Sequence, residues 1–240
     1  MVFFKKTGNR SPINICEKNF KQKRLCIDGR FFICYNLKNR KHMHTYQEKK
    51  FNIPDLNGLS AKQIEVHLKL YAGYVKHVNL LRENIHALEK EDGEKHAYTI
   101  TELRRRFSFE FNGMRLHEYY FECFEGGPRA PDESSMLRQI LSEKYGDFEK
   151  FILHFKSVCM SRGIGWAILY FDQLGKTPHI AWVGDHELGA LAGLPMLFPL
   201  DMWEHAYMVD YTPAEKDTYI NAFLSNLNWE IVENRLKAIN

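Results

Sequence analysis

The chain has 240 residues, enough for one large domain or two small ones with a hydrophobic core. Hydrophobic residues make up 45% and aromatic residues 14% of the composition, which excludes an intrinsically disordered protein. The formal net charge is +3, and no apolar run is long enough to span a membrane or to form the core of a secretory signal peptide.

Residues 1–42 form a basic leader that differs in charge from the rest of the chain. The leader holds 11 Lys and Arg residues against Glu17 and Asp28, whereas residues 43–240 hold 22 basic and 28 acidic residues. The leader has no helical or strand periodicity. A tail of this kind can bind nucleic acid or an anionic surface, and its acid-poor composition also suits a weak targeting peptide. We favour a leader that is disordered or absent from the mature protein, with Met43 as the functional start.

The five cysteines indicate a reduced protein. Their number is odd and none forms a Cys-x-x-Cys pair, which argues against a disulfide framework and against a zinc site in the leader. Only Cys123 and Cys159 lie beyond the leader. We therefore expect a cytoplasmic location.

A long helix is predicted to begin at Ser60. Ser60 and Gln63 form a capping box, with Ser60 as the N-cap and Gln63 at the third helical position. His67, Tyr71 and Tyr74 follow at i, i+4 and i+7, so they share one face of this helix. A single histidine on an apolar helix face is more often structural than a metal ligand, so the helix alone does not assign a function.

A second helix is predicted after a charged turn at residues 91–94. It carries Gly113 and His117 and ends at a linker that contains Gly126, Gly127 and Pro128. Residues 43–130 therefore predict a long helical hairpin domain.

Residues 131–240 predict a C-terminal α/β domain. Helices are expected at residues 136–145 and 148–160, and short strands at 166–171, 179–183 and 196–201. Thr212, Pro213 and Glu215 form a strong helix start, and a last helix begins near Asn228. Because the strands and their connections are short, we expect a small three-stranded antiparallel sheet. The predicted fold class is α+β.

Asp201 and His205 lie four residues apart, directly after the apolar run 194–200. This pattern predicts a buried strand that leads into two metal ligands at the start of a helix, because carboxylate and imidazole suit iron, manganese or zinc. The alternative is an aspartate N-cap with a histidine one turn later. The spacing alone leaves both interpretations open.

The segment Asp-Met-Trp-Glu-His-Ala-Tyr at residues 201–207 resembles the C-terminal signature of the iron/manganese superoxide dismutases. The sequence around His67 resembles the first ligand helix of that family, and the Phe-Asn segment before His117 resembles the second. The resemblance covers residues 52–237. It implies four metal ligands, which are His67, His117, Asp201 and His205.

The resemblance also implies roles for residues around the metal. Tyr74 corresponds to the active-site tyrosine, and His186 occupies the place of a glutamine that bonds metal-bound solvent, so both are predicted to be catalytic. Glu204 corresponds to a residue that bonds a ligand histidine of the partner subunit, which implies a homodimer, or a tetramer built from such dimers. Trp166, Trp203 and Tyr207 are expected to line the metal site with aromatic rings that exclude water.

The sequence departs from the family pattern at the expected substrate gate. The spacing from His67 to Tyr74 is one residue shorter than usual and lacks a second histidine, and Met208 stands in the place of a tyrosine. We therefore expect a remodelled gate or dimer interface. Gly113 is typical of manganese enzymes, whereas a histidine at position 186 occurs with iron and dual-metal enzymes. We favour one iron ion per subunit over manganese.

The function implied by the resemblance is that of an antioxidant oxidoreductase. A superoxide dismutase converts superoxide to dioxygen and hydrogen peroxide by redox cycling of a single iron or manganese ion. The alternative is a metal-binding, dismutase-like protein with low activity and a structural or binding role. Nucleic-acid binding through the leader is a third hypothesis, which we disfavour. Superoxide and a second copy of the chain are the expected partners, without a membrane.

Overall fold

The computed structural model describes residues 23–27, 30–34 and 44–239, which fall into two compact units, Met1–Thr45 and Tyr46–Asn240. In the first unit, β1 (Lys23–Ile27) and β2 (Arg30–Cys34) pair as an antiparallel hairpin that sequence periodicity did not indicate. The rest of the leader, including its predicted disorder, lies outside the described residues. The boundary near residue 130 stays a prediction.

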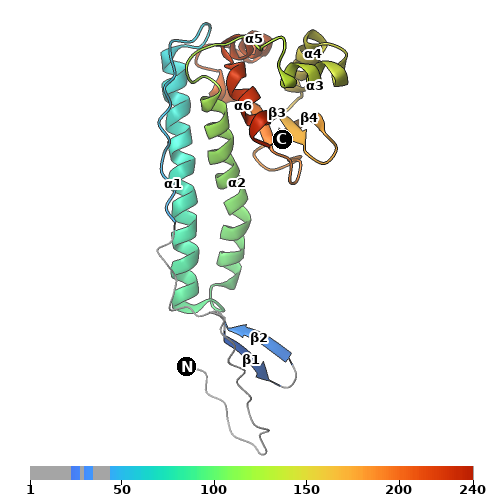
Figure 1. Ribbon diagram of the computed structural model, residues 1–240. Helices are drawn as coiled ribbons and strands as arrows, with labels where there is room; N and C mark the ends of the chain where they lie inside the picture. The colour runs from blue at the N-terminus through green and yellow to red at the C-terminus, as the bar shows by residue number, and fades with distance from the viewer. Residues whose placement is uncertain (1–22, 28–29, 35–43, 240) are drawn as a thin grey trace, which may run out of the picture. The chain divides into compact units, whose positions relative to one another are not determined.

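The predicted helical hairpin is present in the second unit. Helices α1 (Ala61–Asp92) and α2 (Ala97–Glu122) lie side by side (Figure 1). A stripe of α1 residues spaced three or four apart is buried, as expected for an amphipathic helix. The members of this stripe are Gln63, His67, Tyr71, Val75, Val78 and Leu81.

Only half of the predicted capping box at the start of α1 is correct. The Ser60 hydroxyl accepts a hydrogen bond from the Gln63 backbone N–H at 3.0 Å. The Gln63 side chain does not return to Ser60; it is fully buried and reaches another segment. The Ser60 N–H donates instead to Asp210 Oδ2 at 2.7 Å. A tertiary contact has therefore replaced one arm of the local motif.

The C-terminal part contains the predicted antiparallel sheet, in the order β4-β3-β5. The sheet consists of β3 (Gly165–Asp172), β4 (Thr177–Gly184) and β5 (Met196–Asp201), and it follows α3 (Met136–Tyr145) and α4 (Phe148–Cys159). Strand β3 is central and almost entirely buried. Pro199 lies on the edge strand β5, where a missing N–H is tolerated. The α+β fold class is confirmed.

The segment after β5 differs from the prediction. The expected helix start is a single 3-10 turn, η2 (Glu204–Ala206). The capping box at Thr212 and Glu215 is confirmed, although its first turn is the 3-10 helix η3 (Pro213–Glu215). Helices α5 (Lys216–Asn226) and α6 (Trp229–Ile239) complete the chain.

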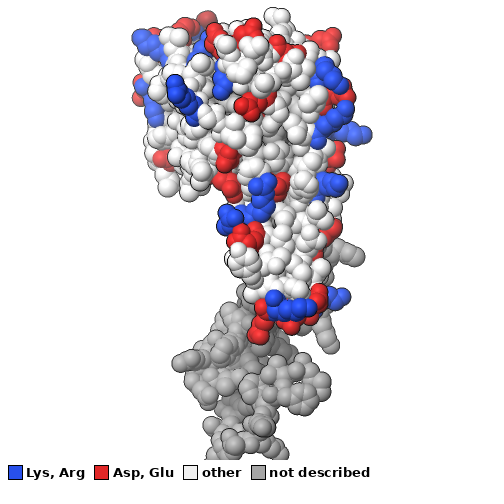
Figure 2. Space-filling model, turned by 180° about the vertical axis from the view of Figure 1, so that it is seen from behind, with Lys and Arg blue, Asp and Glu red and all other residues white. Residues whose placement is uncertain are grey.

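Aromatic side chains form much of the core where the helices meet the sheet. The Tyr120 ring of α2 stacks on Phe223 of α5 at 5.3 Å, and Phe198 of β5 packs edge-on against Trp229 of α6 at 5.6 Å. Basic and acidic residues are interspersed on the face of Tyr46–Asn240 drawn in Figure 2. Among the helices described, none combines the length and apolar character needed to cross a membrane.

Candidate metal centre

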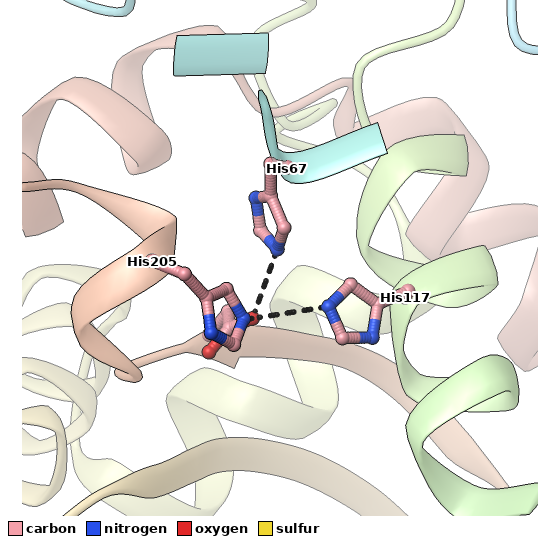
Figure 3. Close-up of side chains that lie close together, drawn as sticks. His67, His117 and His205 are labelled. Atoms are coloured by element: carbon pink, nitrogen blue, oxygen red, sulfur yellow. Dashed lines mark hydrogen bonds and ion pairs between the residues drawn. The ribbon is translucent and has the colours of Figure 1, made fainter. Parts of the chain in front are cut away.

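Four residues from distant parts of the chain converge in the second unit. His67 comes from α1, His117 from α2, Asp201 from the end of β5 and His205 from η2. One donor atom from each lies within 4.8 Å of the others. Figure 3 shows the three imidazole rings directed toward one another, with interactions from two of them meeting at one carboxylate oxygen. The structure thus brings together all four residues that the sequence predicted as ligands.

The Asp201 Oδ2 atom is the meeting point of this cluster. It lies 3.0 Å from His67 Nε2, 3.2 Å from His205 Nε2 and 3.6 Å from His117 Nε2. His67, His117 and Asp201 are fully buried, whereas the His205 side chain is 18% exposed. Three ring nitrogens and one carboxylate oxygen therefore face a common point in the protein interior.

The tautomer of His117 leaves a ring nitrogen without a partner. His117 Nδ1 lies 2.6 Å from the Gly113 carbonyl oxygen, which only accepts hydrogen bonds, so Nδ1 carries the proton. The Nε2 atom of the neutral ring then carries no proton, and its lone pair points toward Asp201. It is buried and has no hydrogen-bond partner among the described residues. Such an atom costs free energy unless something else satisfies it, and a cation would do so.

The pKa directions favour the same protonation states. Burial lowers the pKa of His67, and it lowers that of His117 well below its ordinary value. Burial acts to raise the pKa of Asp201, but the charge and hydrogen bonds of His205 and His67 outweigh it and the pKa is lowered. Three imidazole nitrogens and one negatively charged carboxylate therefore converge, which is a donor set suited to iron, manganese or zinc.

Neighbouring elements hold Asp201 in this orientation. Asp201 pairs with Trp166 in the β3–β5 register, and its backbone carbonyl accepts from the Tyr219 hydroxyl at 2.7 Å. The Trp203 backbone N–H donates to Asp201 Oδ1 at 2.9 Å. Because Oδ1 is engaged by the backbone, Oδ2 is the oxygen that remains to face the histidines.

A hydrogen-bonded chain runs beside the cluster through Trp166, His186 and Tyr74. Trp166 Nε1 can only donate, and it lies 2.9 Å from His186 Nδ1. His186 must therefore carry its proton on Nε2, which donates to the Tyr74 hydroxyl oxygen at 2.8 Å. The Tyr74 O–H is then free to donate elsewhere. Burial is the main cause that raises the pKa of Tyr74 and lowers that of His186 to about 4.

Side chains from other elements hold the backbone of the loop that carries His186. Asn112 Nδ2 donates to the His186 carbonyl at 2.9 Å, and Trp203 Nε1 donates to the Asp185 carbonyl at 3.2 Å. Asp185 has a φ of 51°, an uncommon conformation for a residue other than glycine. The Trp203 ring stacks on His186 at 4.9 Å. The loop is therefore fixed by α2 and by the segment after β5.

The other predicted residues lie around the cluster at different depths. Trp166 and Trp203 pack against His117 and His205, with ring centroids 5.1 and 5.6 Å apart. Tyr207 is buried and packs against Tyr219 rather than against a histidine of the cluster. Glu204 and Met208 are both exposed.

Sequence reasoning missed three aromatic neighbours of the site. The Phe109 ring lies 4.6 Å from His186, and Tyr120 and Phe121 each lie 4.9 Å from His67. Helical spacing from His117 could have indicated Tyr120 and Phe121, at i+3 and i+4.

Tyr71 was predicted on the same helix face as His67 and Tyr74, but its hydroxyl points away from the cluster. It accepts from the Lys49 N–H at 2.8 Å and donates to the buried Glu118 at 3.2 Å. Tyr71 therefore ties the segment before α1 to the helical hairpin.

Comparison with known proteins identifies relatives that are all named superoxide dismutase. Residues 133–235 match the family model described as iron/manganese superoxide dismutases, C-terminal domain. The chain is 30% identical to the superoxide dismutase (Fe) of Saccharolobus solfataricus, over 80% of this chain and 95% of that protein. It is 31% identical to the superoxide dismutase (Fe) of Aquifex aeolicus, over 81% and 92%, and 29% identical to the superoxide dismutase (Mn/Fe) of Aeropyrum pernix, over 79% and 92%. The chain therefore belongs to the iron/manganese superoxide dismutase family.

Proposed function

We propose that the chain is a superoxide dismutase in which His67, His117, Asp201 and His205 hold one iron or manganese ion. Family membership supports the activity. The observation that carries the ligand assignment is the bare, buried Nε2 of His117, which faces Asp201 Oδ2 at 3.6 Å. A redox-inert ion such as zinc would suit the donor atoms but not the reaction.

When bound, the ion supplies one-electron chemistry, by which one superoxide is oxidised to dioxygen and a second superoxide, with two protons, is reduced to hydrogen peroxide. The protein has to exclude bulk water around the site and deliver protons to it. Trp166, Phe109 and Trp203 line the surroundings of the histidines with apolar rings. This packing supports the proposal that aromatic rings exclude water from the metal site.

Tyr74 is the proposed proton donor of this site. Its oxygen accepts from His186 Nε2–H, so its own O–H remains available. Burial raises the pKa of Tyr74, which keeps the hydroxyl protonated at neutral pH. His186 orients this group, and Trp166 selects the His186 tautomer that can donate.

We favour iron over manganese as the natural ion. The names of the relatives cited above include iron and dual manganese/iron enzymes. The test is to purify the full chain, measure iron and manganese per subunit by elemental analysis, and compare superoxide removal after reconstitution with each metal. Higher activity with manganese would contradict this choice.

The ligand assignment is tested by paired histidine substitutions on one helix. His67→Gln removes a proposed ligand, whereas His77→Gln changes an α1 histidine whose side chain is 55% exposed. We expect H67Q to lose bound metal and activity, and H77Q to retain both. Stoichiometric metal with activity near background in the unmodified chain would instead favour the dismutase-like protein of structural role.

We further propose a cytoplasmic antioxidant enzyme that forms a homodimer. The dimer proposal is supported by the exposure of Glu204 and Met208 next to His205. The location is supported by Cys123 and Cys159, which are both free and buried, as expected in a reducing compartment.

A further inference from the structure

Gln63 is a fully buried amide one helical turn before His67 on α1. Its side chain makes two hydrogen bonds to the segment that carries His205. Gln63 Nε2 donates to the His205 carbonyl oxygen at 2.7 Å, and Gln63 Oε1 accepts from the Val209 N–H at 3.0 Å. This one amide therefore binds both ends of the segment 205–209, through the His205 carbonyl and the Val209 N–H.

Two more contacts join the same segment to the start of α1. The Ser60 N–H donates to Asp210 Oδ2 at 2.7 Å, and the Tyr211 hydroxyl donates to the Gly58 carbonyl. The η2 turn itself is three residues long and has no side-chain cap. Because so short a turn has little rigidity of its own, its position depends on tertiary contacts, among them these bonds to α1 and to the residues just before it.

We propose that Gln63 is a positioning residue that fixes His205 relative to His67, and thereby sets the affinity and coordination geometry of the metal. Gln63 and His67 lie on one face of a single rigid helix. The amide therefore couples the ligand from α1 to the ligand from η2 through the His205 backbone. This inference rests on the proposed metal centre.

The chemistry of the site explains why an amide is needed. The His205 carbonyl requires a donor and the Val209 N–H requires an acceptor, and a side-chain amide supplies both at once. An apolar side chain of the same length would leave both backbone groups without a protein partner. The segment would then shift toward water or another partner, and His205 would move with it.

The test compares Gln63→Met with Asn79→Leu in the full chain. Asn79 provides a matched control because it is also an α1 amide with two bonds to one backbone segment: it accepts from Tyr46 N–H and donates to the Tyr46 carbonyl, both at 2.9 Å. It lies three turns further along the helix than His67. Both variants should unfold at lower temperature. Only Q63M should bind iron about 10-fold or more weakly, the range seen when a group that orients a ligand is lost.

A spectroscopic readout separates positioning from general stability. The ferric electron paramagnetic resonance signal of Q63M should differ from that of the unmodified chain, whereas the signal of N79L should not. Unchanged affinity and an unchanged signal in Q63M, with an active unmodified chain, would overturn this inference and leave the proposed function intact.

Hydrogen exchange supplies a measurement that needs neither metal nor a folded variant. In the metal-free, unmodified chain the Val209 amide proton should exchange at least 10-fold more slowly than the same amide in the unfolded chain, because it is bonded to a buried acceptor. Exchange of the Val209 amide at the rate of a free loop amide would overturn the proposed positioning role of Gln63, even if Q63M cannot be purified. A chain that binds neither iron nor manganese would overturn the proposed function separately.

Discussion

Gly113 of α2 lies directly against the ring of Tyr74 on α1. A Cβ atom at position 113 would lie 2.6 Å from Tyr74 Cδ1 and 2.7 Å from Cε1, which is closer than real contacts allow. The same glycine also supplies the carbonyl that fixes the His117 tautomer. The absence of a side chain at position 113 therefore allows the tyrosine to sit between the two ligand helices and reach His186.

The first prediction concerns this contact. Gly113→Ala should push the Tyr74 ring away, weaken its bond to His186, destabilise the protein by about 1–3 kcal/mol and lower activity. Gly73→Ala is the control, because a Cβ there meets nothing within 4 Å and alanine is the better helix former, by about 1 kcal/mol. Denaturant unfolding checks both. Equal stability of the two variants would contradict the packing argument.

The second prediction concerns acid stability. The pKa of His186 in the folded protein is about 4, below its ordinary value of 6.5, so the unfolded chain takes up the proton first as pH falls. The contribution of His186 to the free energy of unfolding is therefore complete above pH 6.5. About 3 kcal/mol of that contribution is lost as the pH falls from 6.5 to 4.

His186→Gln isolates this effect, because glutamine can still accept from Trp166 and donate to Tyr74. Urea unfolding of both proteins at pH 7 and pH 4.5 should show a smaller loss for the variant. The same acid loss in both proteins would assign it to other groups.

The third prediction concerns the leader. Removal of residues 1–42 should leave metal content and superoxide removal unchanged, because Tyr46–Asn240 form a compact unit that contains all four proposed ligands. The segment after the deletion keeps its own anchors, since Lys49 donates to Glu122 and Asn79 holds Tyr46. Loss of folding in the shortened chain would show that the leader has a structural role.

The fourth prediction concerns the proposed dimer. Met208 is 50% exposed and Val209 is 46% exposed, so they offer apolar surface next to His205. Met208→Asp should place a charge in the buried interface and raise the dimer dissociation constant by tenfold or more, as measured by sedimentation. Leu174→Asp is the control, since Leu174 is 97% exposed in the turn between β3 and β4. A dimer unaffected by M208D would place the interface elsewhere.

The sequence alone determined the local elements and the identity of the four converging residues. Ser60 and Thr212 predicted helix starts that are present, because a cap depends on atoms only a few residues apart. The apolar run before Asp201 predicted strand β5, and the resemblance to a known family singled out His67, His117, Asp201 and His205.

Only the tertiary structure decided how these residues are held. Gln63 was expected to complete a local capping box, yet it binds a segment more than 140 positions away. The His186 tautomer depends on Trp166, and the space for Tyr74 depends on Gly113 of the facing helix. Periodicity and capping report interactions within one element, whereas these contacts form only when α1, α2 and the sheet pack together, so no local pattern encodes them.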